Sequence, residues 1–312
     1  MARKLVVLDP GSLLGEELVP LLSSQFPQLP RAYLHTRPEE DHLILQVAGE
    51  AAVVAPLGGL EELEDAAAIV LTARPAPQAR ERLAAFFQAN PHLPCLDASG
   101  AGVLPGPPSL VPSPEKPQLR FPDPLLLLPS LLLQALARLE PREAFFTVLA
   151  PVSSVGGEAL DELAAQAVAR LSGEKPRAEL LPAVLAFDAI PYPEKTPGTL
   201  QQELQALFPA TRIALHPLLA GVFHAHSVLA TFRLAGAKAE AKELLSAASF
   251  VAHRGKTPLA PSRGAGEPQA AFQLLGSGPE TLTLWAVGDH LLLSAQAAAQ
   301  ALEELLRAFP PA

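Results

Sequence analysis

Hydrophobic positions in the first hundred residues follow two patterns, short apolar runs and longer stretches with an apolar residue every three or four positions. The apolar runs predict strands at residues 4–8, 32–35, 69–72 and 94–97. The helical spacing predicts helices at residues 15–22 and 77–89. Because strands that alternate with helices build parallel βαβ units, this part of the chain is predicted to be an α/β domain.

After residue 124 the strands no longer alternate regularly with helices. Apolar runs predict strands at residues 145–150, 222–234 and 281–287. Apolar faces predict helices at residues 125–139, 158–171 and 294–309. The first of these helices has Asp123 as a candidate N-cap and Pro124 at its first position, and Pro129 is expected to kink it or delay its start. This part is predicted to be an α+β domain whose last helix is free to return to the first domain.

Proline separates the two parts. It recurs every few residues between positions 105 and 124, where the loss of backbone donors excludes a long helix or a central strand. That stretch is therefore a linker or an extended crossover. Together with a length of 312 residues, it predicts two domains, residues 1–120 with 290–312 and residues 121–289.

Composition narrows the classes of protein. Hydrophobic residues make up 49% and charged residues 18%, which is typical of a globular chain. The net charge of -9 disfavours nucleic acid as a partner, because phosphate binding depends on Lys and Arg. The apolar run at residues 5–8 is too short for a signal-peptide core, and residues 129–130 interrupt the run 125–137, so no membrane span is expected. A single cysteine fits a reducing compartment, and a soluble cytoplasmic protein is expected.

The first candidate site is the turn after the strand at residues 4–8, where residues 9–15 read DPGSLLG. In a Rossmann-like dinucleotide-binding fold this turn is rich in glycine, so that N–H groups at the helix N-terminus approach the pyrophosphate. Here Gly11 and Gly15 remain, and Asp9 stands at the first glycine position, where its carboxylate is expected to repel a phosphate. The turn is either a nucleotide loop or a strand-to-helix turn without a ligand.

Histidine and cysteine offer two further candidates. On the predicted strand 222–234, His224 and His226 point the same way because side chains alternate with a period of two, so together they could form half of a metal site, with His216 as the nearest third ligand. The alternative is a histidine that is packed in the interior, hydrogen-bonded and inert, and the sequence contains no compact set of metal ligands. Cys95, the only cysteine, lies on a predicted strand, where an inert buried thiol is expected.

Short segments along the chain occur in an order that resembles the aspartate-semialdehyde dehydrogenase family. They are DPGSLLG at 9–15, DASG at 97–100, FPDP at 121–124, VSSVGG at 152–157, AFDAIP at 186–191, VFHAHS at 222–227 and WAVGDHL at 285–291. The corresponding family patterns include G-x-T-G-x-V-G, D-x-S, V-S-G-A-G, G-H-S and W-x-V-x-D-N-L. The resemblance spans nearly the full length and is closer to the degenerate, non-catalytic branch of that family.

The resemblance implies a chemistry that this chain carries only in part. In active members a cysteine thiolate attacks the semialdehyde, a histidine handles protons, hydride passes to NADP, and phosphate cleaves the thioester. Pro124 stands at the position of that cysteine, Leu219 at that of the substrate-binding arginine, and His226 at that of the histidine. Proline has neither a thiol nor a hydroxyl, and leucine cannot hold a carboxylate through paired hydrogen bonds.

The same resemblance implies cofactor contacts in the first domain. They fall on Gly11, Ser12, Leu14, Gly15, Asp97 and Ser99. Asp and Ser after a strand also form ordinary turns, so the last two have a structural alternative. NADP is a candidate cofactor that the altered loop disfavours.

These residues predict a family member that has lost phosphorylating dehydrogenase activity. Such a pseudoenzyme would act as a binding or structural homodimer, paired through the apolar face of the strand at 222–234, with a small molecule as a candidate ligand. The alternative is an active NAD(P)-dependent semialdehyde oxidoreductase that uses rearranged site residues. A third hypothesis pairs the chain with active relatives in mixed dimers.

Overall fold

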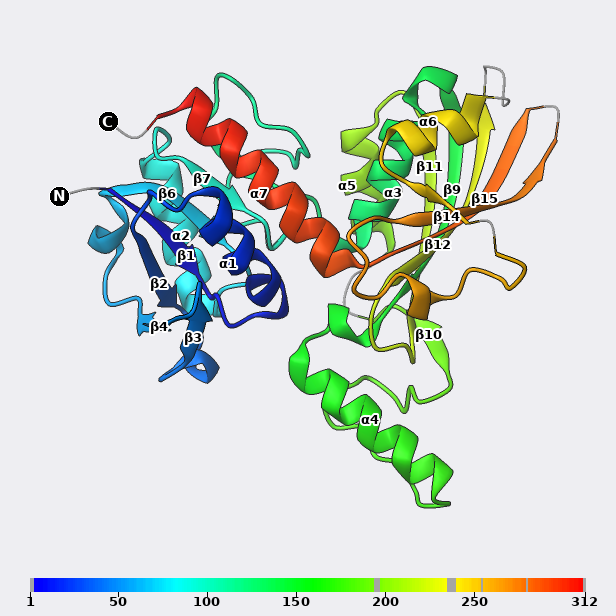
Figure 1. Ribbon diagram of the computed structural model, residues 1–312, viewed down its shortest axis with the longest axis horizontal. Coiled ribbons are helices and arrows are strands. Elements are labelled where there is room, and N and C mark those ends of the chain that lie inside the picture. The colour runs from blue at the N-terminus through cyan, green and yellow to red at the C-terminus, as the bar shows by residue number, and fades with distance from the viewer. Residues whose placement is uncertain (1–2, 194–196, 235–239, 254, 279, 311–312) are drawn as a thin grey trace. The chain divides into compact units, whose positions relative to one another are not determined.

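The computed structural model describes residues 3–193, 197–234, 240–253, 255–278 and 280–310 (Figure 1). Contacts within the chain divide it into two compact units. Unit 1 comprises residues 1–123 with 294–312, and unit 2 comprises residues 124–293. The domain boundaries predicted from the sequence stand at 120/121 and 289/290. Among the described residues, no helix is both long and apolar enough to cross a membrane.

Unit 1 is built on a parallel six-stranded sheet. In spatial order its strands are β5 (Ala55–Pro56), β2 (Arg31–His35), β1 (Lys4–Leu8), β6 (Ala66–Leu71), β7 (Cys95–Asp97) and β8 (Gln118–Arg120). The chain reverses direction along the sheet between β2 and β6, which places the crossover helices on opposite faces. The α/β prediction for the first part of the chain is therefore confirmed.

Helices cover both faces of this sheet (Figure 1). They are α1 (Leu13–Gln25), α2 (Pro77–Ala89) and the larger part of α7 (His290–Ala308), whose first four residues belong to unit 2. On one face, Val6 and Ile69 pack against Leu83 and Phe87 of α2. On the other face Leu5 and Val7 are also fully buried, so β1 is apolar on both sides, as a central parallel strand requires. A separate hairpin of β3 (Ile44–Val47) and β4 (Glu50–Val53) follows β2.

Unit 2 contains a mixed seven-stranded sheet. Its order is β10 (Ala189–Pro191), β11 (Arg212–Ala220), β9 (Pro141–Ala150), β12 (His226–Leu234), β15 (Thr281–Gly288), β14 (Ala271–Ser277) and β13 (Val251–Ala252). The pairs β11–β9 and β13–β14 are parallel, and the other neighbours are antiparallel. Parallel and antiparallel pairs in one sheet confirm the α+β prediction for this part of the chain.

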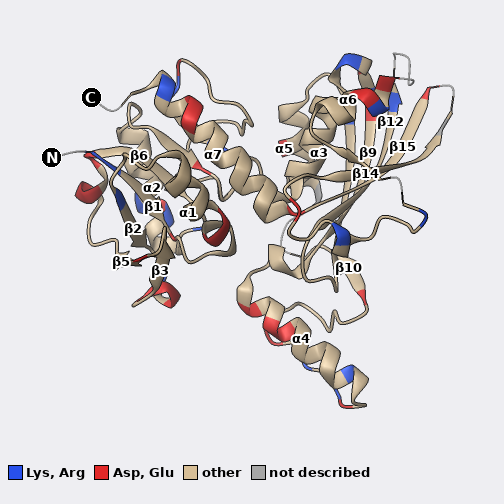
Figure 2. Ribbon diagram, in the orientation of Figure 1, with Lys and Arg blue, Asp and Glu red and all other residues tan. Residues whose placement is uncertain are grey.

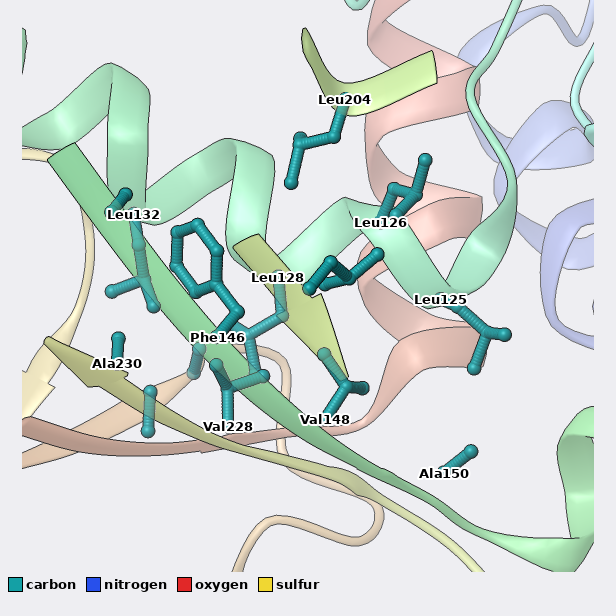
Figure 3. Close-up of a cluster of buried hydrophobic side chains, with 14 of the residues drawn as sticks. Leu125, Leu126, Leu128, Leu132, Phe146, Val148, Ala150, Leu204, Val228 and Ala230 are labelled. Atoms are coloured by element: carbon teal, nitrogen blue, oxygen red, sulfur yellow. The ribbon is translucent and has the colours of Figure 1, made fainter. Parts of the chain in front are cut away.

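Helices α3 (Pro124–Ala135), α5 (Pro197–Leu207) and α6 (Ala241–Ala247) cover one face of this sheet, and α4 (Gly157–Leu171) extends from the end of β9 (Figure 1). Figure 3 shows leucines of α3 pointing at alternate residues of β9 and β12, among them Phe146 and Val228. The ring of Phe146 meets that of Phe232 edge to face, with 5.6 Å between centroids. Because α3 is buried on most of its surface, its continuous run of leucines fits a central helix.

The opposite face of the same sheet is open. Phe145 of β9 has 46% of its surface exposed and Leu229 of β12 has 37%. At one end of this face, Glu143, Arg233 and Glu280 line a shallow hollow of about 460 Å³. We call the outward side chains of β11, β9, β12 and β15 the open sheet face.

Short 3-10 helices complete the fold. They are η1 (Pro38–Glu40), η2 (Leu60–Leu63), η3 (Ala137–Leu139), η4 (Val152–Ser154) and η6 (Pro261–Arg263). The proline-rich stretch before residue 124 contains only β8, at the edge of the unit 1 sheet, as its composition predicts.

Helix α3 begins at Pro124, so of the two outcomes expected of Pro129, a kink or a delayed start, the delayed start does not occur. One local prediction is wrong. The strand predicted over 222–234 begins only at His226, because Ala225 has a left-handed backbone with φ of 69°. His224 therefore lies outside the strand, and the alternation that would pair it with His226 does not apply.

Candidate functional site

The candidate nucleotide turn of unit 1 begins with Asp9, a residue with a left-handed backbone (φ 56°) and no exposed surface. Its carboxylate accepts hydrogen bonds from the backbone N–H of Thr36 at 2.6 Å and from the Thr36 hydroxyl at 2.8 Å. These bonds tie the end of β1 to the end of its neighbour β2. Burial raises the pKa of Asp9, and the Thr36 bonds oppose that rise. From the sequence this carboxylate was expected to repel a phosphate. In the structure it is hydrogen-bonded to Thr36.

Ser12 caps helix α1, because its hydroxyl accepts the N–H of Gly15 at 3.0 Å. The same hydroxyl lies 3.1 Å from that of Thr72, which in turn donates to the carbonyl oxygens of Leu8 and Asp9 at the C-terminal end of β1. Packing alone explains why position 15 is a glycine, since a Cβ there would collide with the carbonyl of Pro10. Leu14 is buried in the first turn of α1. The residues predicted to touch a cofactor thus build the turn itself.

The N–H of Gly11, the group that would face a phosphate, has a partner within the chain. It donates to Oε2 of Glu40 at 2.9 Å. Glu40 ends η1 and is almost fully buried. Its pKa is raised by burial and by the nearby charge of Asp9. Two carboxylates therefore lie at a turn that in nucleotide-binding folds receives an anion.

Asp97 and Ser99 close the turn after β7. The Asp97 carboxylate accepts the Ser99 hydroxyl at 2.6 Å and the N–H of Val103 at 3.0 Å, and the Ser99 hydroxyl accepts the N–H of Ala101 at 3.1 Å. The polar groups of Asp97 and Ser99 are therefore hydrogen-bonded within the loop that follows β7. Ordinary turn formation therefore accounts for both residues.

Cys95 lies on β7, between β6 and β8, and has no exposed surface. Burial, together with the charge of Asp97, holds the pKa of the Cys95 thiol well above its usual range. A thiol of this kind is a small hydrophobic group rather than a nucleophile.

The second candidate site lies in unit 2, around His226 at the start of β12. His226 is fully buried, and its ring stacks on that of His290, the first residue of α7. Burial, then the neighbouring His290, lowers the pKa of His226 well below its usual value. Neither ring nitrogen of either histidine has a hydrogen-bond partner among the described residues. The hydrogen bonds expected of a packed histidine are therefore missing, although its burial is as expected.

His290 was not among the residues selected from the sequence. The preceding Asp289 caps α7, because its carboxylate accepts the N–H of Leu291 at 3.0 Å and also that of Gly266 at 2.8 Å. Burial lowers the pKa of His290 to about 4, against the opposing effect of Asp289. In the sequence His290 lies within the segment WAVGDHL at 285–291 and four residues before the predicted start of the last helix, and neither feature marked it as a site residue.

Pro124 and Leu219 stand at the family's cysteine and arginine positions by resemblance, and Leu219 belongs to the hydrophobic core of unit 2. Pro124 is the first residue of α3, and Leu219 is fully buried on β11 between β9 and β10. In the described part of the chain, no group of three or more His, Cys, Asp and Glu side chains is placed to hold a metal ion. The hypothesis of a site with His216 as third ligand is therefore not supported.

Comparison with known proteins identifies the fold. No protein-family model matches the chain, and no curated protein matches it. Among solved structures, a probable aspartate-semialdehyde dehydrogenase from Pseudomonas aeruginosa is 21% identical, covers 98% of this chain and 99% of its own, and superposes with a TM-score of 0.82. Aspartate-semialdehyde dehydrogenase II from Vibrio cholerae is 16% identical over 98% of this chain and 99% of its own, with a TM-score of 0.83.

A third structure, aspartate-semialdehyde dehydrogenase with NADP from Candida albicans, is 13% identical over 98% of this chain and 99% of its own, with a TM-score of 0.67. The chain therefore has the two-part fold of aspartate-semialdehyde dehydrogenases along almost its entire length. At these identities the likeness establishes the fold, as the order of the sequence segments predicted.

Proposed function

We propose that this chain is a non-catalytic protein with the aspartate-semialdehyde dehydrogenase fold, and that it acts as a binding or structural homodimer. The observation that carries the proposal is the place of its only thiol. Cys95 is sealed inside the parallel sheet of unit 1, with a raised pKa, while helix α3 opens with Pro124. A covalent route through a thioester needs an exposed thiolate, and the chain supplies none.

The surroundings of His226 support the same proposal. A histidine that moves protons near neutral pH needs a partner and a pKa close to that pH. His226 is instead fully buried, has no hydrogen-bond partner in the described structure, and has a strongly lowered pKa. It is better suited to packing than to proton transfer. A small-molecule ligand remains part of the proposal, and the expected location is the reducing cytoplasm, in keeping with a single free cysteine.

The activity test uses the reaction of the fold's namesake enzymes. The purified protein is mixed with aspartate semialdehyde, phosphate and NADP, and NADPH formation is followed by absorbance beside the Vibrio cholerae enzyme as positive control. No rate above the no-protein blank, and no acyl adduct by intact mass spectrometry, are expected. A steady rate that His226→Ala abolishes would establish the alternative, an active oxidoreductase with rearranged residues.

Pairing as a homodimer is proposed for the open sheet face. Phe145 and Leu229 give it an exposed apolar centre, and at one end Arg212 and Arg233 flank Glu143 across three neighbouring strands. A surface on which positive and negative side chains alternate can pair with a second copy of itself related by a twofold axis, because arginines of one copy can then face glutamates of the other. The remaining charged residues are spread over the elements of both units (Figure 2).

Sedimentation velocity tests the pairing with two variants that carry the same new charge. Leu229→Glu places a carboxylate at the centre of the open sheet face and is expected to yield monomers. Leu171→Glu, at the end of α4 where the side chain is 80% exposed, is the matched control and is expected to remain dimeric. A wild-type monomer, or equal effects of the two variants, would refute pairing through this face. Co-purification with an active relative would instead favour mixed dimers.

A further inference from the structure

The N–H of Gly11, at the turn before helix α1 in unit 1, has a charged partner within the chain. A helix N-terminus presents unpaired N–H groups and a positive dipole end, so it attracts anions. Helix α1 has such an end, and Gly11, the residue directly before its N-cap Ser12, already donates its N–H to a carboxylate oxygen, Oε2 of Glu40, at 2.9 Å. The anion here is a side chain of the same chain, 29 residues further on.

Glu40 is held firmly in that place. It ends η1, which Pro38 begins, and only 3% of its surface is exposed. The second carboxylate oxygen, Oε1, lies 3.9 Å from Nε of Arg37 and has no hydrogen-bond partner among the described residues. A carboxylate buried in this way is stabilised by the Gly11 N–H and by the nearby charge of Arg37, so it competes directly with any other anion for that N–H.

Side chains also fill the space beside Gly11, in addition to placing a negative charge there. A Cβ built on Gly11 would collide with the Cδ2 methyl of Leu43 and would lie 3.1 Å from the carboxyl carbon of Glu40. An apolar methyl and a carboxylate thus fill the space beside Gly11, and the carboxylate occupies the N–H that a phosphate would bind. Ser12 and Asp9 cannot rearrange freely to make room, because they are bonded to Thr72 and Thr36.

We infer that Glu40 is the resident anion of this turn, and that together with Leu43 it keeps dinucleotide phosphates away from helix α1. A pyrophosphate would have to displace a buried carboxylate and would then face the charges of both Glu40 and Asp9. NADP, which the Candida albicans structure contains, therefore does not fit this turn as folded. The inference goes beyond the proposed function, because it concerns an anion site in unit 1 and would hold equally for a catalyst that uses no nucleotide.

The test measures NADPH binding to the full chain by nucleotide fluorescence and by titration calorimetry. The double variant Glu40→Ala with Leu43→Ala removes both the charge and the methyl group. The matched control is Glu39→Ala, which removes one negative charge from the neighbouring residue, a half-exposed glutamate bonded to Arg37 at 2.8 Å. The double variant is expected to bind NADPH at least about tenfold more tightly than the wild type and the control.

Amide resonances locate the binding. In the double variant, the N–H signals of Gly11 and Ser12 are expected to shift on addition of NADPH, and in the wild type they are expected to stay in place. If the double variant does not fold, as its thermal unfolding curve would show, Glu40→Gln keeps the shape and removes the charge, and should bind more tightly than Glu39→Ala. Wild-type binding that shifts the Gly11 signal would overturn the inference. So would affinities of the Glu40 variants no higher than that of the control.

Discussion

The imidazole rings of His226 and His290 lie parallel, with 4.3 Å between their centroids and 9° between their planes. One ring comes from the first residue of β12 and the other from the first residue of α7, so the stack joins the start of a strand to the start of a helix. Both side chains are buried, and burial is the largest cause of the lowered pKa of each. At neutral pH the pair is uncharged, and the contact is one between two aromatic rings.

This pair makes the stability of the protein sensitive to mild acid. In the unfolded chain each histidine takes up a proton near pH 6.5, whereas in the folded state the pKa of His290 is about 4 and that of His226 is also well lowered. Because the unfolded state binds more protons in this range, the free energy of unfolding is expected to fall as the pH drops from 6.5 towards 4, and the contribution of His290 is expected to level off below pH 4. For His290 alone the loss is on the order of 3 kcal/mol.

Urea unfolding at pH 7.5, 6, 5 and 4 measures this loss. His290→Phe keeps an aromatic ring in the stack and cannot titrate, so its stability is expected to depend less steeply on pH than that of the wild type. His92→Phe, at an exposed position in the loop before β7, is the control and should keep the wild-type slope. Parallel slopes for all three proteins would show that the stacked pair does not carry the acid sensitivity.

Asp97 is predicted to act through the turn after β7 and not through a ligand. Its carboxylate accepts hydrogen bonds from two N–H groups and one hydroxyl and has no exposed surface. Asp97→Ala is expected to reduce the free energy of unfolding by about 2–3 kcal/mol, because buried donors lose a charged acceptor. Asp188→Ala, which removes an exposed partner of Arg170, should change it by less than about 1 kcal/mol. Equal, small losses would refute this role.

Cys95 should be chemically silent in the native protein. Its thiol is fully buried and its pKa is raised, so thiolate is scarce and out of reach of reagents. Reaction with a disulfide reagent at pH 8 is expected to be slow in buffer and to reach one thiol per chain within minutes in concentrated urea. A native rate close to that of free cysteine would contradict both the burial and the proposal of a chain without an accessible nucleophile.

The bounds of an element were predicted correctly where residues that start or stop a helix stand at its ends. Helix α2 was predicted residue for residue, because Pro77 stands at its first position and Asn90 with Pro91 follows it. Strand β12 was predicted four residues too long, because its apolar run continues upstream and nothing in hydrophobicity reports the left-handed turn at Ala225. Strands β11 and β14 were not predicted, since Pro217 and Gly276 interrupt their apolar alternation.

The candidate sites were harder to predict, because their partners are distant in sequence. Composition of the first turn showed that glycines were missing. It could not show that Glu40 accepts the N–H of Gly11. Nor could it show that the Asp9 carboxylate is hydrogen-bonded to Thr36 and does not face the solvent. Contacts of this kind follow from the pairing of β1 with β2, which places the residues after both strands at the same edge of the sheet. The order of family-like segments predicted the fold correctly, and the Pseudomonas aeruginosa structure shares that fold at 21% identity.

Gln166 on α4 offers a last prediction, about a loop rather than a site. Its side-chain amide is buried and bonds the loop that follows α4 at three points, donating to the carbonyl of Arg177 at 2.9 Å and accepting the N–H groups of Leu185 at 2.8 Å and Ala186 at 3.3 Å. A single side chain thus fixes both ends of a ten-residue segment that has no regular structure of its own. Gln166→Leu conserves volume and removes all three bonds, together with the one that the amide donates to Oε1 of Glu162 at 3.0 Å, and it leaves buried backbone groups unpaired.

Hydrogen exchange of the segment 177–186 should therefore rise by at least about tenfold in Gln166→Leu, because opening it no longer breaks those bonds. Global stability should fall by about 1–3 kcal/mol. Gln300→Leu, on the exposed side of α7, makes the same chemical change away from the loop and should leave the exchange of that segment unaltered. The neighbouring Glu162 accepts the N–H groups of Glu179 and Leu180 and also the Gln166 amide at 3.0 Å, so loosening measured in Gln166→Leu reports the loss of the three loop bonds together with the loss of this support for Glu162. Unchanged exchange in Gln166→Leu would mean that Glu162 is sufficient to hold the loop.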